Sequence, residues 1–448
     1  MLVEAGDFAG GTSSRSTKLL HGGVRYLAQG QLALVREALH ERTSLIDLDP
    51  RVSHPLRFVM PAYRWWQPLL YGAGLLAYDW LAGSASLGPT RYLSRQKTLE
   101  RYPQLQADGL RGAVSYCDAQ FDDAGLAIAM ARGASQSGAL LINRMRALAV
   151  TRADSVAMHT EVADEESGER YAIVSRDVIN AAGVWVDTLR QAAPMVQPSQ
   201  GAHIVVARSF FPADEAVLWP QTADGRVLFM VPWLNHCVIG TTDTPRDPAD
   251  VALGREPLPF SAEIDLILAE TGKVLRRAPT RADVLSAWAG LRPLVKPRVS
   301  NTSGMTAGTT AQISREHAIE IAANGLLTIT GGKWTTCLAM ARDALRALPH
   351  RPLALDGSPT GPLPADGPIC AARAPTDEEV DWLVHHAWAR TVEDVLARRS
   401  RLLFLDVRAA LAAAPAVARA LERATGRDPD LDGFRLLGQT WLGRFRND

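Results

Sequence analysis

The sequence has little lysine and little cysteine, and it lacks any long apolar segment. Only five of the 48 basic residues are lysine, so a lysine inside a motif is more informative here than usual. The four cysteines, at positions 117, 237, 337 and 370, form no CxxC pair, which excludes a zinc motif and a disulfide framework and favours a reducing compartment. No run of 18 apolar residues is present, which argues against a membrane-spanning helix.

The sequence also lacks a charge excess. Its 48 basic residues equal its 48 acidic residues, so no overall field attracts nucleic acid. A hydrophobic content of 47 % over 448 residues is typical of a globular protein with two or three domains. The first residues do not have the pattern of a signal peptide. We therefore expect a cytoplasmic protein, or one on the cytoplasmic face of a membrane.

A short apolar segment that ends in an acidic residue opens the sequence. Leu2 and Val3 are typical of the end of a buried strand, and Glu4 would then lie at its carboxyl tip. In dinucleotide-binding units an acid in this position binds the adenosine ribose, about 20 residues after a glycine-rich turn. No such turn precedes Glu4 in the sequence. We therefore expect the sequence to start within a Rossmann-like unit.

Three further segments favour contact with an anionic cofactor. The small polar residues of 10–18, with Lys18, suit a pyrophosphate better than a core, although a flexible surface loop is the alternative. Residues 180–185 place Gly183 in a turn after an apolar strand. Residues 331–336 place two glycines and Lys333 between an apolar strand and a helix, where backbone amides favour negative charge. For both glycine segments the alternative is a plain tight turn.

Two other patterns point to a substrate site. His21, Arg25 and Tyr26 stand within six residues around two glycines, a combination that favours an anion site. Arg292 and Arg315 lie in regions flanked by apolar residues, although surface ion pairs are the commoner role of arginine. By contrast, residues 72–77 match the letters G-x-G-x-x-A without a preceding strand, and they indicate the small-residue face of a helix.

The rest of the sequence suggests a mixed α and β organisation. Apolar periodicity predicts a helix over 28–49 and helices over 376–425. Short apolar runs between 200 and 245 predict β-strands. Seven prolines between 349 and 375 predict a linker, because proline interrupts regular elements.

Together these segments resemble the FAD-dependent, quinone-linked glycerol-3-phosphate dehydrogenases. The stretches that carry the resemblance are 2–8, 11–27, 200–206, 239–243, 288–293 and 331–336. The resemblance implies a glutathione-reductase-type fold of the α+β or α/β class, in which a Rossmann-like FAD domain without its first strand and glycine motif joins a β-rich substrate cap and a C-terminal helical domain. The implied boundaries are 1–56, 112–190 and 300–348 for the FAD domain, 57–111 and 191–299 for the cap, 349–375 for the linker and 376–448 for the helical domain.

The resemblance also implies roles for individual residues. The implied cofactor residues are Glu4, Thr12, Ser13, Ser14, Lys18, Gly183, Gly332 and Thr335. The implied substrate-phosphate residues are Arg25, Tyr26, Thr241, Arg315 and Lys333. His21 and Arg292 would stand beside the hydroxyl that is oxidised. Because arginine stays protonated, we expect His21 to accept the proton and Arg292 to stabilise charge.

The implied activity is oxidation of sn-glycerol 3-phosphate to dihydroxyacetone phosphate, with FAD as cofactor and a membrane quinone as electron acceptor. The alternatives are a related flavin oxidase that uses oxygen and a remnant without cofactor or activity. Because the pyrophosphate lacks the glycine motif that binds it, we expect the chain as written to retain little FAD. A homodimer is possible, and no metal is expected.

Residues 57–83 are rich in aromatic side chains. Trp65, Trp66 and Trp80 stand among leucines, with Arg57 and Arg64 nearby. Tryptophan suits the membrane interface, because one end of its ring system is apolar and the other can hydrogen-bond. We expect short interfacial segments, interrupted by Pro61, Pro68 and two glycines, that hold the protein peripherally on the inner face of the cytoplasmic membrane. A buried aromatic cluster is the alternative.

Overall fold

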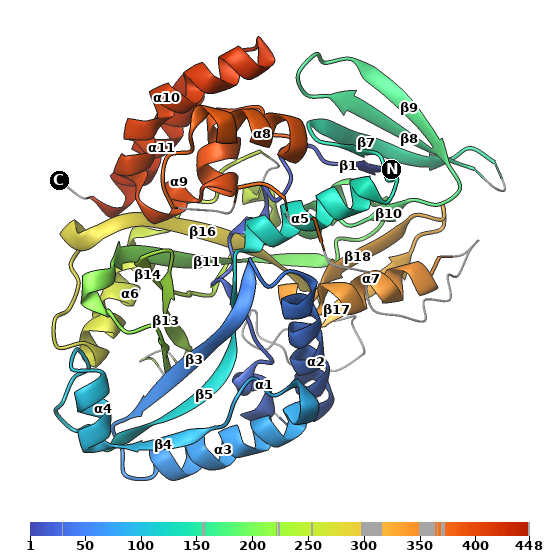
Figure 1. The fold of residues 1–448 in the computed structure, drawn as a ribbon. Coiled ribbons are helices and arrows are strands. Elements are labelled where there is room, and N and C mark those ends of the chain that lie inside the picture. The colour runs from blue at the N-terminus through green and yellow to red at the C-terminus, as the bar shows by residue number, and fades with distance from the viewer. Residues whose placement is uncertain are drawn as a thin grey trace.

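The computed structural model describes residues 1–28, 30–154, 157–220, 222, 225–251, 254–296, 316–348, 363–364, 366–368 and 372–446. A large, mostly antiparallel sheet forms the centre of the fold, with smaller sheets beside it and helices around it (Figure 1). The predicted linker lies mostly outside the described residues.

Among the described residues, the largest sheet has ten strands. Along its main path the order is β15 (Thr244–Pro245), β11 (Val196–Ala207), β14 (His236–Gly240), β13 (Leu228–Trp233), β12 (Ala216–Trp219), β3 (Ser53–Ala62), β5 (Gly112–Phe121) and β2 (Leu19–Leu20), while β16 (Val284–Val295) pairs with β11 and β4 (Arg91–Ser94) pairs with β5. The longest pairing joins β11 to β16, so that Gly201 stands opposite Gly290 and Ser199 opposite Arg292. The strands predicted between 200 and 245 are thus confirmed as parts of one sheet.

Three small sheets make up the Rossmann-like part. They are β1 (Leu2–Val3) with β6 (Leu141–Ile142), β10 (Ile179–Asn180) with β18 (Leu327–Gly331) and β17 (His317–Ile321), and β7 (Met145–Arg152) with β8 (Met158–Asp164) and β9 (Arg170–Ser175). The pairs β1–β6 and β10–β18 are parallel, as a dinucleotide-binding unit requires. Among the described residues, β1 pairs only with β6 and β10 only with β18.

Helices surround the sheets, and several confirm the periodicity of the sequence. The predicted helix over 28–49 is confirmed as α2, and the predicted C-terminal helices are confirmed as α8 to α10. The α-helices are α1 (Val24–Ala28), α2 (Leu32–Leu48), α3 (Gln67–Ala82), α4 (Arg95–Arg101), α5 (Asp123–Gln136), α6 (Ser261–Val274), α7 (Cys337–Arg346), α8 (Asp377–Ala387), α9 (Leu402–Leu405), α10 (Val407–Thr425) and α11 (Leu431–Phe445). Four short helical turns matter for the site, namely η1 (Thr12–Ser14), η3 (Gly183–Thr188), η8 (Trp334–Thr336) and the π-helical η9 (Asp394–Arg399).

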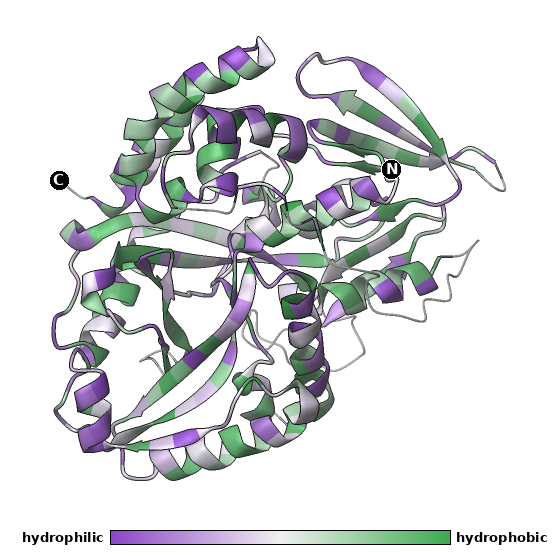
Figure 2. Cartoon of the chain, viewed as in Figure 1, coloured by the Kyte–Doolittle hydropathy of each residue, from purple (hydrophilic) through white to green (hydrophobic). Residues whose placement is uncertain are grey.

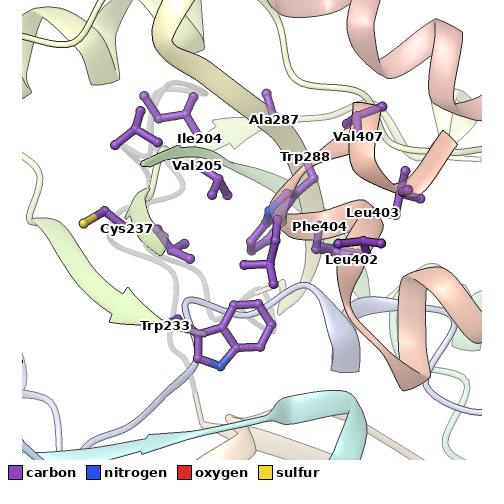
Figure 3. Close-up of a cluster of buried hydrophobic side chains, with 14 of the residues drawn as sticks. Ile204, Val205, Trp233, Cys237, Ala287, Trp288, Leu402, Leu403, Phe404 and Val407 are labelled. Carbon is purple, nitrogen blue, oxygen red and sulfur yellow. The ribbon is translucent and has the colours of Figure 1, made fainter. Parts of the chain in front are cut away.

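The main hydrophobic core joins the C-terminal helices to the large sheet. Trp288 on β16 is fully buried and meets the ring of Phe404 on α9 edge to face, with ring centroids 5.1 Å apart. Figure 3 shows these two rings beside Trp233 from β13 and aliphatic side chains of β11. Because apolar burial is the dominant stabilising term in folding, this shared core fixes the C-terminal helices against the sheet that carries the site.

The prediction of short, broken segments over residues 57–83 is wrong. Residues 53–62 form strand β3, and residues 67–82 form the single helix α3. Pro68 lies in the first turn of α3, where a missing N–H breaks no helical hydrogen bond. Gly72 and Gly74 each cost a helix about 1 kcal/mol, which the buried side chains of Leu75 and Tyr78 offset.

Candidate active site

A cavity of about 840 Å³ lies between the large sheet, the N-terminal segment, helix α3 and the turn after β18. Eight of the predicted site residues line it, namely Thr12, His21, Tyr26, Thr241, Arg292, Gly332, Lys333 and Thr335. The cavity lining does not include Glu4, Ser13, Ser14, Lys18 or Gly183. Arg315 and the side chain of Arg25 lie outside the described part of the chain.

The Arg292 guanidinium is held in place by neighbours on the adjoining strands. Its Nη1 donates to the carbonyl oxygen of Thr242 at 3.0 Å, and its Nη2 donates to Oγ1 of Thr241 at 3.0 Å. The Asp243 carboxylate lies 3.5 Å from Nη1. A Cβ at Gly201 would stand 2.4 Å from Nη2, so only glycine leaves room for this guanidinium beside β11.

His21 reaches the cavity through a chain segment that is fixed by side chains. Its backbone N–H donates to Oγ1 of Thr335 at 3.3 Å, and the next amide, of Gly22, donates to the Tyr78 hydroxyl at 2.8 Å. Burial raises the pKa of Tyr78 well above its ordinary value, so the phenol keeps its proton and donates it to Asp118 at 2.7 Å. The His21 backbone is therefore positioned by two independent contacts.

Lys333 and Tyr26 form the cationic part of the cavity wall. The Lys333 Nζ lies 3.7 Å from the centroid of the Tyr26 ring, a distance at which the ring face attracts the ammonium. Gly331 and Gly332, just before the lysine, have left-handed backbone conformations with φ of +81° and +69°. This turn places Lys333 beside the Tyr26 ring. A Cβ at Gly332 would stand 2.4 Å from Sδ of Met340, so the second glycine is needed for both its conformation and its small size.

His203 is a candidate site residue that was not assigned a role from the sequence. It lines the cavity, stacks on Trp288 with ring centroids 4.1 Å apart, and shares a 2.9 Å hydrogen bond between its Nε2 and Oγ1 of Thr17. Burial lowers the pKa of His203 well below its ordinary value, and the nearby positive charges of Lys18 and Arg292 act in the same direction. The imidazole is therefore neutral. The available signal was a polar residue within the apolar run 202–206.

Glu4 and Gly183 lie at the ends of parallel strands, as predicted. Glu4 follows β1, and its Oε1 accepts a hydrogen bond from the amide of Gly6 at 3.0 Å, while burial raises its pKa. Gly183 follows β10 with φ of +59°, and a Cβ there would meet nothing within 4 Å. Thr330 on β18 donates to the Gly183 carbonyl at 2.9 Å, which ties the two strand ends together.

Lys18 has a different environment from the one predicted. Its side chain is fully buried, and its Nζ donates to Asp123 at 2.7 Å and to the carbonyl oxygen of Ser14 at 2.8 Å. Burial lowers the pKa of Lys18, although the carboxylate of Asp123 acts in the opposite direction. This position does not support the predicted pyrophosphate contact. The sequence could not show it, because Asp123 is 105 residues away.

Contacts between distant segments bring residues 11–13 beside Leu291, Trp334 and Trp185. Thr12 donates to the carbonyl of Leu291 at 2.6 Å, and Trp334 donates to the carbonyl of Ser13 at 2.8 Å. A Cβ at Gly11 would lie 3.2 Å from the ring of Trp185, in the turn that begins at Gly183. These segments therefore surround one region.

The residues present fit the ring end of a flavin. His203 lines the cavity, and its Nδ1 is buried with no hydrogen-bond partner among the described residues, which suits a ligand that supplies one. Thr12 and Thr335 line the cavity on the side of the N-terminal segment and of the turn after β18. These residues, with Gly332, are those that would hold the flavin.

Comparisons with known proteins agree with this geometry. Residues 1–343 match the family described as FAD dependent oxidoreductase, and residues 310–431 match the C-terminal domain of alpha-glycerophosphate oxidase. The chain is 40 % identical over 367 residues to the mitochondrial glycerol-3-phosphate dehydrogenase of Homo sapiens, which covers 77 % of this chain and 49 % of that protein. It is 38 % identical over 364 residues to the mitochondrial glycerol-3-phosphate dehydrogenase SDP6 of Arabidopsis thaliana, covering 77 % of this chain and 56 % of that protein. The chain thus spans about half the length of these relatives.

Solved structures agree with the same assignment. The glycerol-3-phosphate dehydrogenase of Bacillus halodurans, solved in complex with FAD, superposes with a TM-score of 0.70 at 25 % identity and covers 99 % of this chain and 89 % of that one. The FAD-bound L-alpha-glycerophosphate oxidase of Mycoplasma pneumoniae shares the fold, with a TM-score of 0.58 at 15 % identity over 82 % of this chain and 92 % of that one. The resemblance drawn from the sequence is confirmed, and the chain belongs to the FAD-dependent oxidoreductase family, within the group that contains the glycerol-3-phosphate dehydrogenases.

Proposed function

We propose that this protein oxidises sn-glycerol 3-phosphate to dihydroxyacetone phosphate with FAD and passes the electrons to a quinone. The observation that carries the proposal is the cavity itself, which is lined by His21, Arg292 and Lys333 together with the glycine turn of residues 331–332. Cationic groups suit a phosphate dianion, and an imidazole suits the proton of the reacting hydroxyl.

Lys333 is proposed to bind the substrate phosphate. Its ammonium is oriented by the Tyr26 ring, and the adjoining Tyr26 and Thr241 side chains also line the cavity. Arg25 and Arg315 are proposed as further phosphate ligands from the resemblance, since their side chains lie outside the described residues.

His21 is proposed to take the proton of the C2 hydroxyl, and Arg292 to stabilise the charge that develops on the oxygen. Arginine stays protonated and cannot act as the base. Its two hydrogen bonds to the segment 241–242 fix its position, so stabilisation costs no rearrangement during the reaction. When bound, FAD supplies the two-electron acceptor for the hydride that leaves C2.

A substrate comparison tests the reaction. The purified chain with added FAD should reduce a short-chain quinone when sn-glycerol 3-phosphate is present, and glycerol should be a far poorer donor. Quinone reduction that does not depend on the phosphate, or none with flavin bound, would contradict the proposal. Formation of hydrogen peroxide without quinone reduction would favour the oxidase alternative instead.

Lys333→Ala tests the phosphate contact directly. The variant should raise KM for sn-glycerol 3-phosphate by about tenfold or more, because a charge-assisted bond to the phosphate is lost. Activity towards glycerol should change little. Lys97→Ala serves as the control, since Lys97 on α4 is exposed and does not line the cavity. Equal effects of Lys333→Ala on both substrates would indicate a structural role.

The membrane and the quinone belong to the same proposal. On α3, the side chains of Leu69, Leu76 and Trp80 are exposed by 73 %, 60 % and 80 %, and Trp65 just before the helix is exposed by 76 %. Figure 2 shows apolar residues along this helix at the edge of the molecule. Another part of α3, including Tyr71 and Leu75, lines the cavity. One helix would thus contact lipid and also border the route of a lipophilic acceptor.

None of the helices among the described residues is long and apolar enough to cross a bilayer. The proposed attachment is therefore peripheral, through the apolar stripe on α3, with Arg64 beside it at the headgroups. Trp66 is half-buried, whereas Trp65 and Trp80 are exposed, so Trp65 and Trp80 are the better candidates for insertion.

Liposome co-sedimentation tests the attachment. The double variant Leu76→Ser/Trp80→Ser should bind vesicles much less than the unmodified chain, while Leu436→Ser, at a similarly exposed leucine on α11, should not change binding. Equal binding by all three folded proteins would show that α3 does not dock. The predicted homodimer stays a prediction, and sedimentation equilibrium would decide it.

A further inference from the structure

Arg401 is a buried arginine that connects the C-terminal helices to turn η1 in the N-terminal segment of the site. Arg401, between η9 and α9, is completely buried. Its Nη2 donates to the carbonyl oxygen of Ser14 at 2.7 Å and to Oδ1 of Asp123 at 3.0 Å, and its Nη1 donates to the carbonyl of Ala397 at 2.9 Å. The guanidinium also lies 4.4 Å from the centroid of the Phe404 ring. One side chain therefore joins the C-terminal core, helix α5 and turn η1.

Asp123, the first residue of α5, is the centre of this cluster. Its Oδ2 accepts from Lys18 at 2.7 Å and from the amide and hydroxyl of Ser16 at 3.0 and 2.7 Å. Burial opposes ionisation, but the charges of Lys18 and Arg401 hold the pKa of Asp123 below its ordinary value. The Asp123 carboxylate is thus ionised, and its hydrogen bonds fix the conformation of residues 14–18.

The segment that the cluster holds also borders the cavity. Thr12, Ser16 and Thr17 line the cavity, and Thr17 shares its hydrogen bond with His203. Lys18 and Arg401, in contrast, are not among the lining residues. A protein in which apolar side chains replace a buried ion pair is often as stable as the original protein. A hydrogen-bonded ionic network can nevertheless select one backbone conformation. The cluster around Asp123 therefore lies where it can set the conformation of this part of the cavity wall.

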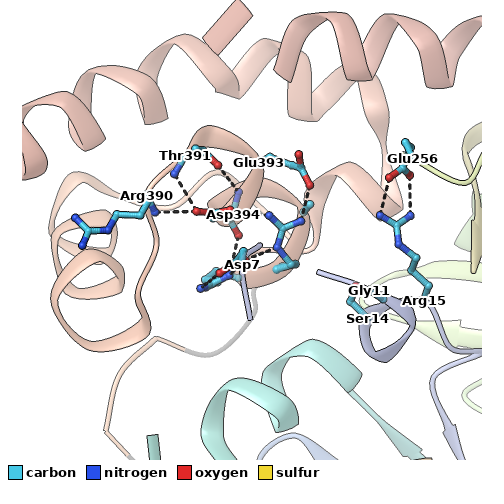
Figure 4. Close-up of polar contacts among 12 residues, drawn as sticks. Asp7, Gly11, Ser14, Arg15, Glu256, Arg390, Thr391, Glu393 and Asp394 are labelled. Carbon is cyan, nitrogen blue, oxygen red and sulfur yellow. Dashed lines mark hydrogen bonds and ion pairs between the residues drawn. The ribbon is translucent and has the colours of Figure 1, made fainter. Parts of the chain in front are cut away.

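Two further ion-paired contacts hold the same segment, as Figure 4 shows. Asp7 accepts from Nη2 of Arg399 at 2.7 Å and also pairs with Arg398. The Arg15 guanidinium donates two hydrogen bonds to the Glu256 carboxylate, at 2.7 and 2.8 Å. These contacts flank residues 12–14 but do not touch them, so Arg401 is the C-terminal side chain whose hydrogen bond reaches η1.

We infer that Arg401 is a positioning residue for the flavin site, through which the docked C-terminal helices set the conformation of residues 12–18. The inference rests on the proposed function for the identity of the ligand. Arg401 touches no reacting atom, and its effect passes through the Ser14 carbonyl and Asp123.

The test compares Arg401→Met with Arg132→Met. Arg132 is also buried and joins α5 to the C-terminal part through Asp366 and the ring of Trp382, but it does not contact residues 12–18. Arg401→Met should weaken FAD binding by about tenfold or more and alter the visible spectrum of bound flavin, because the charge-assisted hydrogen bonds to Ser14 and Asp123 are lost. Arg132→Met should lower Tm comparably and leave both flavin readouts unchanged. Arg401→Lys keeps the positive charge but not the branched guanidinium, and its affinity for FAD should be intermediate.

Amide hydrogen exchange of the chain without flavin gives a second readout. Residues 14–18 should exchange faster in Arg401→Met than in Arg132→Met. The inference would be overturned if the two variants exchanged residues 14–18 at equal rates, or if they had equal Tm and equal affinity for FAD. Flavin binding that depends on Arg401 in a chain that fails to oxidise sn-glycerol 3-phosphate would contradict the proposed function and still support this inference. Should Arg401→Met not fold, Arg401→Lys provides the same comparison.

Discussion

Gly201 shows how much of the candidate site depends on the absence of one side chain. The glycine lies on β11 directly beside the Arg292 guanidinium and the Thr241 hydroxyl, and a Cβ would stand 2.4 and 2.6 Å from them. Such distances are too short for any methyl group, so either the strand or the guanidinium would move. Its neighbour on β14, Gly240, likewise leaves room for the His203 ring, 2.3 Å from a Cβ there.

Gly201→Ala is expected to reduce the activity much more than the stability. A displacement of Arg292 by about 1 Å can lower kcat/KM about 100-fold, because charge stabilisation depends on exact placement. Steady-state kinetics with sn-glycerol 3-phosphate and the Tm of the same preparation check this. The control is Gly72→Ala, on α3, where a Cβ meets nothing within 4 Å and alanine should stabilise slightly. A Gly201→Ala enzyme with unchanged kcat/KM would show that Arg292 is not needed in this position.

The same residues mark the limits of prediction from sequence. The shared cavity of His21, Arg292 and Lys333 was expected from the resemblance to the family, because each of them lies in a short contiguous motif that carries the resemblance. Lys18 was assigned to the cofactor because it ends a polar run, but its partner Asp123 is brought to it only by the fold. His203 was missed because a histidine within an apolar strand is usually structural.

At the scale of elements, local patterns were sufficient where a helix or turn depends on its own residues. The strand, glycine turn and helix over 326–348 are found as β18, η8 and α7, since the glycines and the apolar run are local signals. Helix α3 was mistaken for broken segments, because much of the apolar surface that stabilises it lies on α2 and β5, which are not adjacent to it in the sequence. The pairing of β11 with β16 could not be predicted for the same reason.

Helix α10 offers a test of a local signal. Asp406 caps it, accepting from the amides of Arg408 and Ala409 at 2.9 and 3.0 Å. Asp406→Ala should lower the free energy of unfolding by about 1 kcal/mol, because two amides lose their acceptor. Asp406→Asn, which retains an acceptor oxygen, should cost much less. Urea unfolding of the three proteins measures the difference, and equal losses in both variants would show that the charge matters rather than the cap.

At the scale of the whole molecule, docking of the C-terminal helices should depend on pH. Burial by itself would raise the pKa of Asp394, but Arg398, Arg144 and Arg399 hold it far below its ordinary value. The folded protein therefore binds this proton less tightly than the unfolded chain. The resulting stability is fully present above the unfolded pKa of about 4 and is lost as the pH falls below it.

Asp394→Asn should make the stability of the protein less dependent on pH in the acid range. The variant should lose about 3 kcal/mol at neutral pH, because it leaves buried arginines without their carboxylate. Between pH about 5 and 3 its Tm should then fall less steeply than that of the unmodified chain. Asp432→Asn, whose carboxylate is 94 % exposed beside Arg435, is the control and should follow the unmodified chain. Parallel curves for Asp394→Asn would contradict a role of this ionisation in docking.

The hydrogen bond between Arg401 and Ser14 has a consequence for biosynthesis. The two residues are 387 positions apart, and a ribosome that adds about 5 to 20 residues per second reaches Arg401 about 20 to 80 s after Ser14. During that interval the N-terminal turn has no C-terminal partner. Because Asp7 also lacks its partners until Arg398 and Arg399 have been synthesised, this end of the site is completed only after residues 398–401 have been added. Flavin should therefore be captured only after those residues have packed against the N-terminal segment.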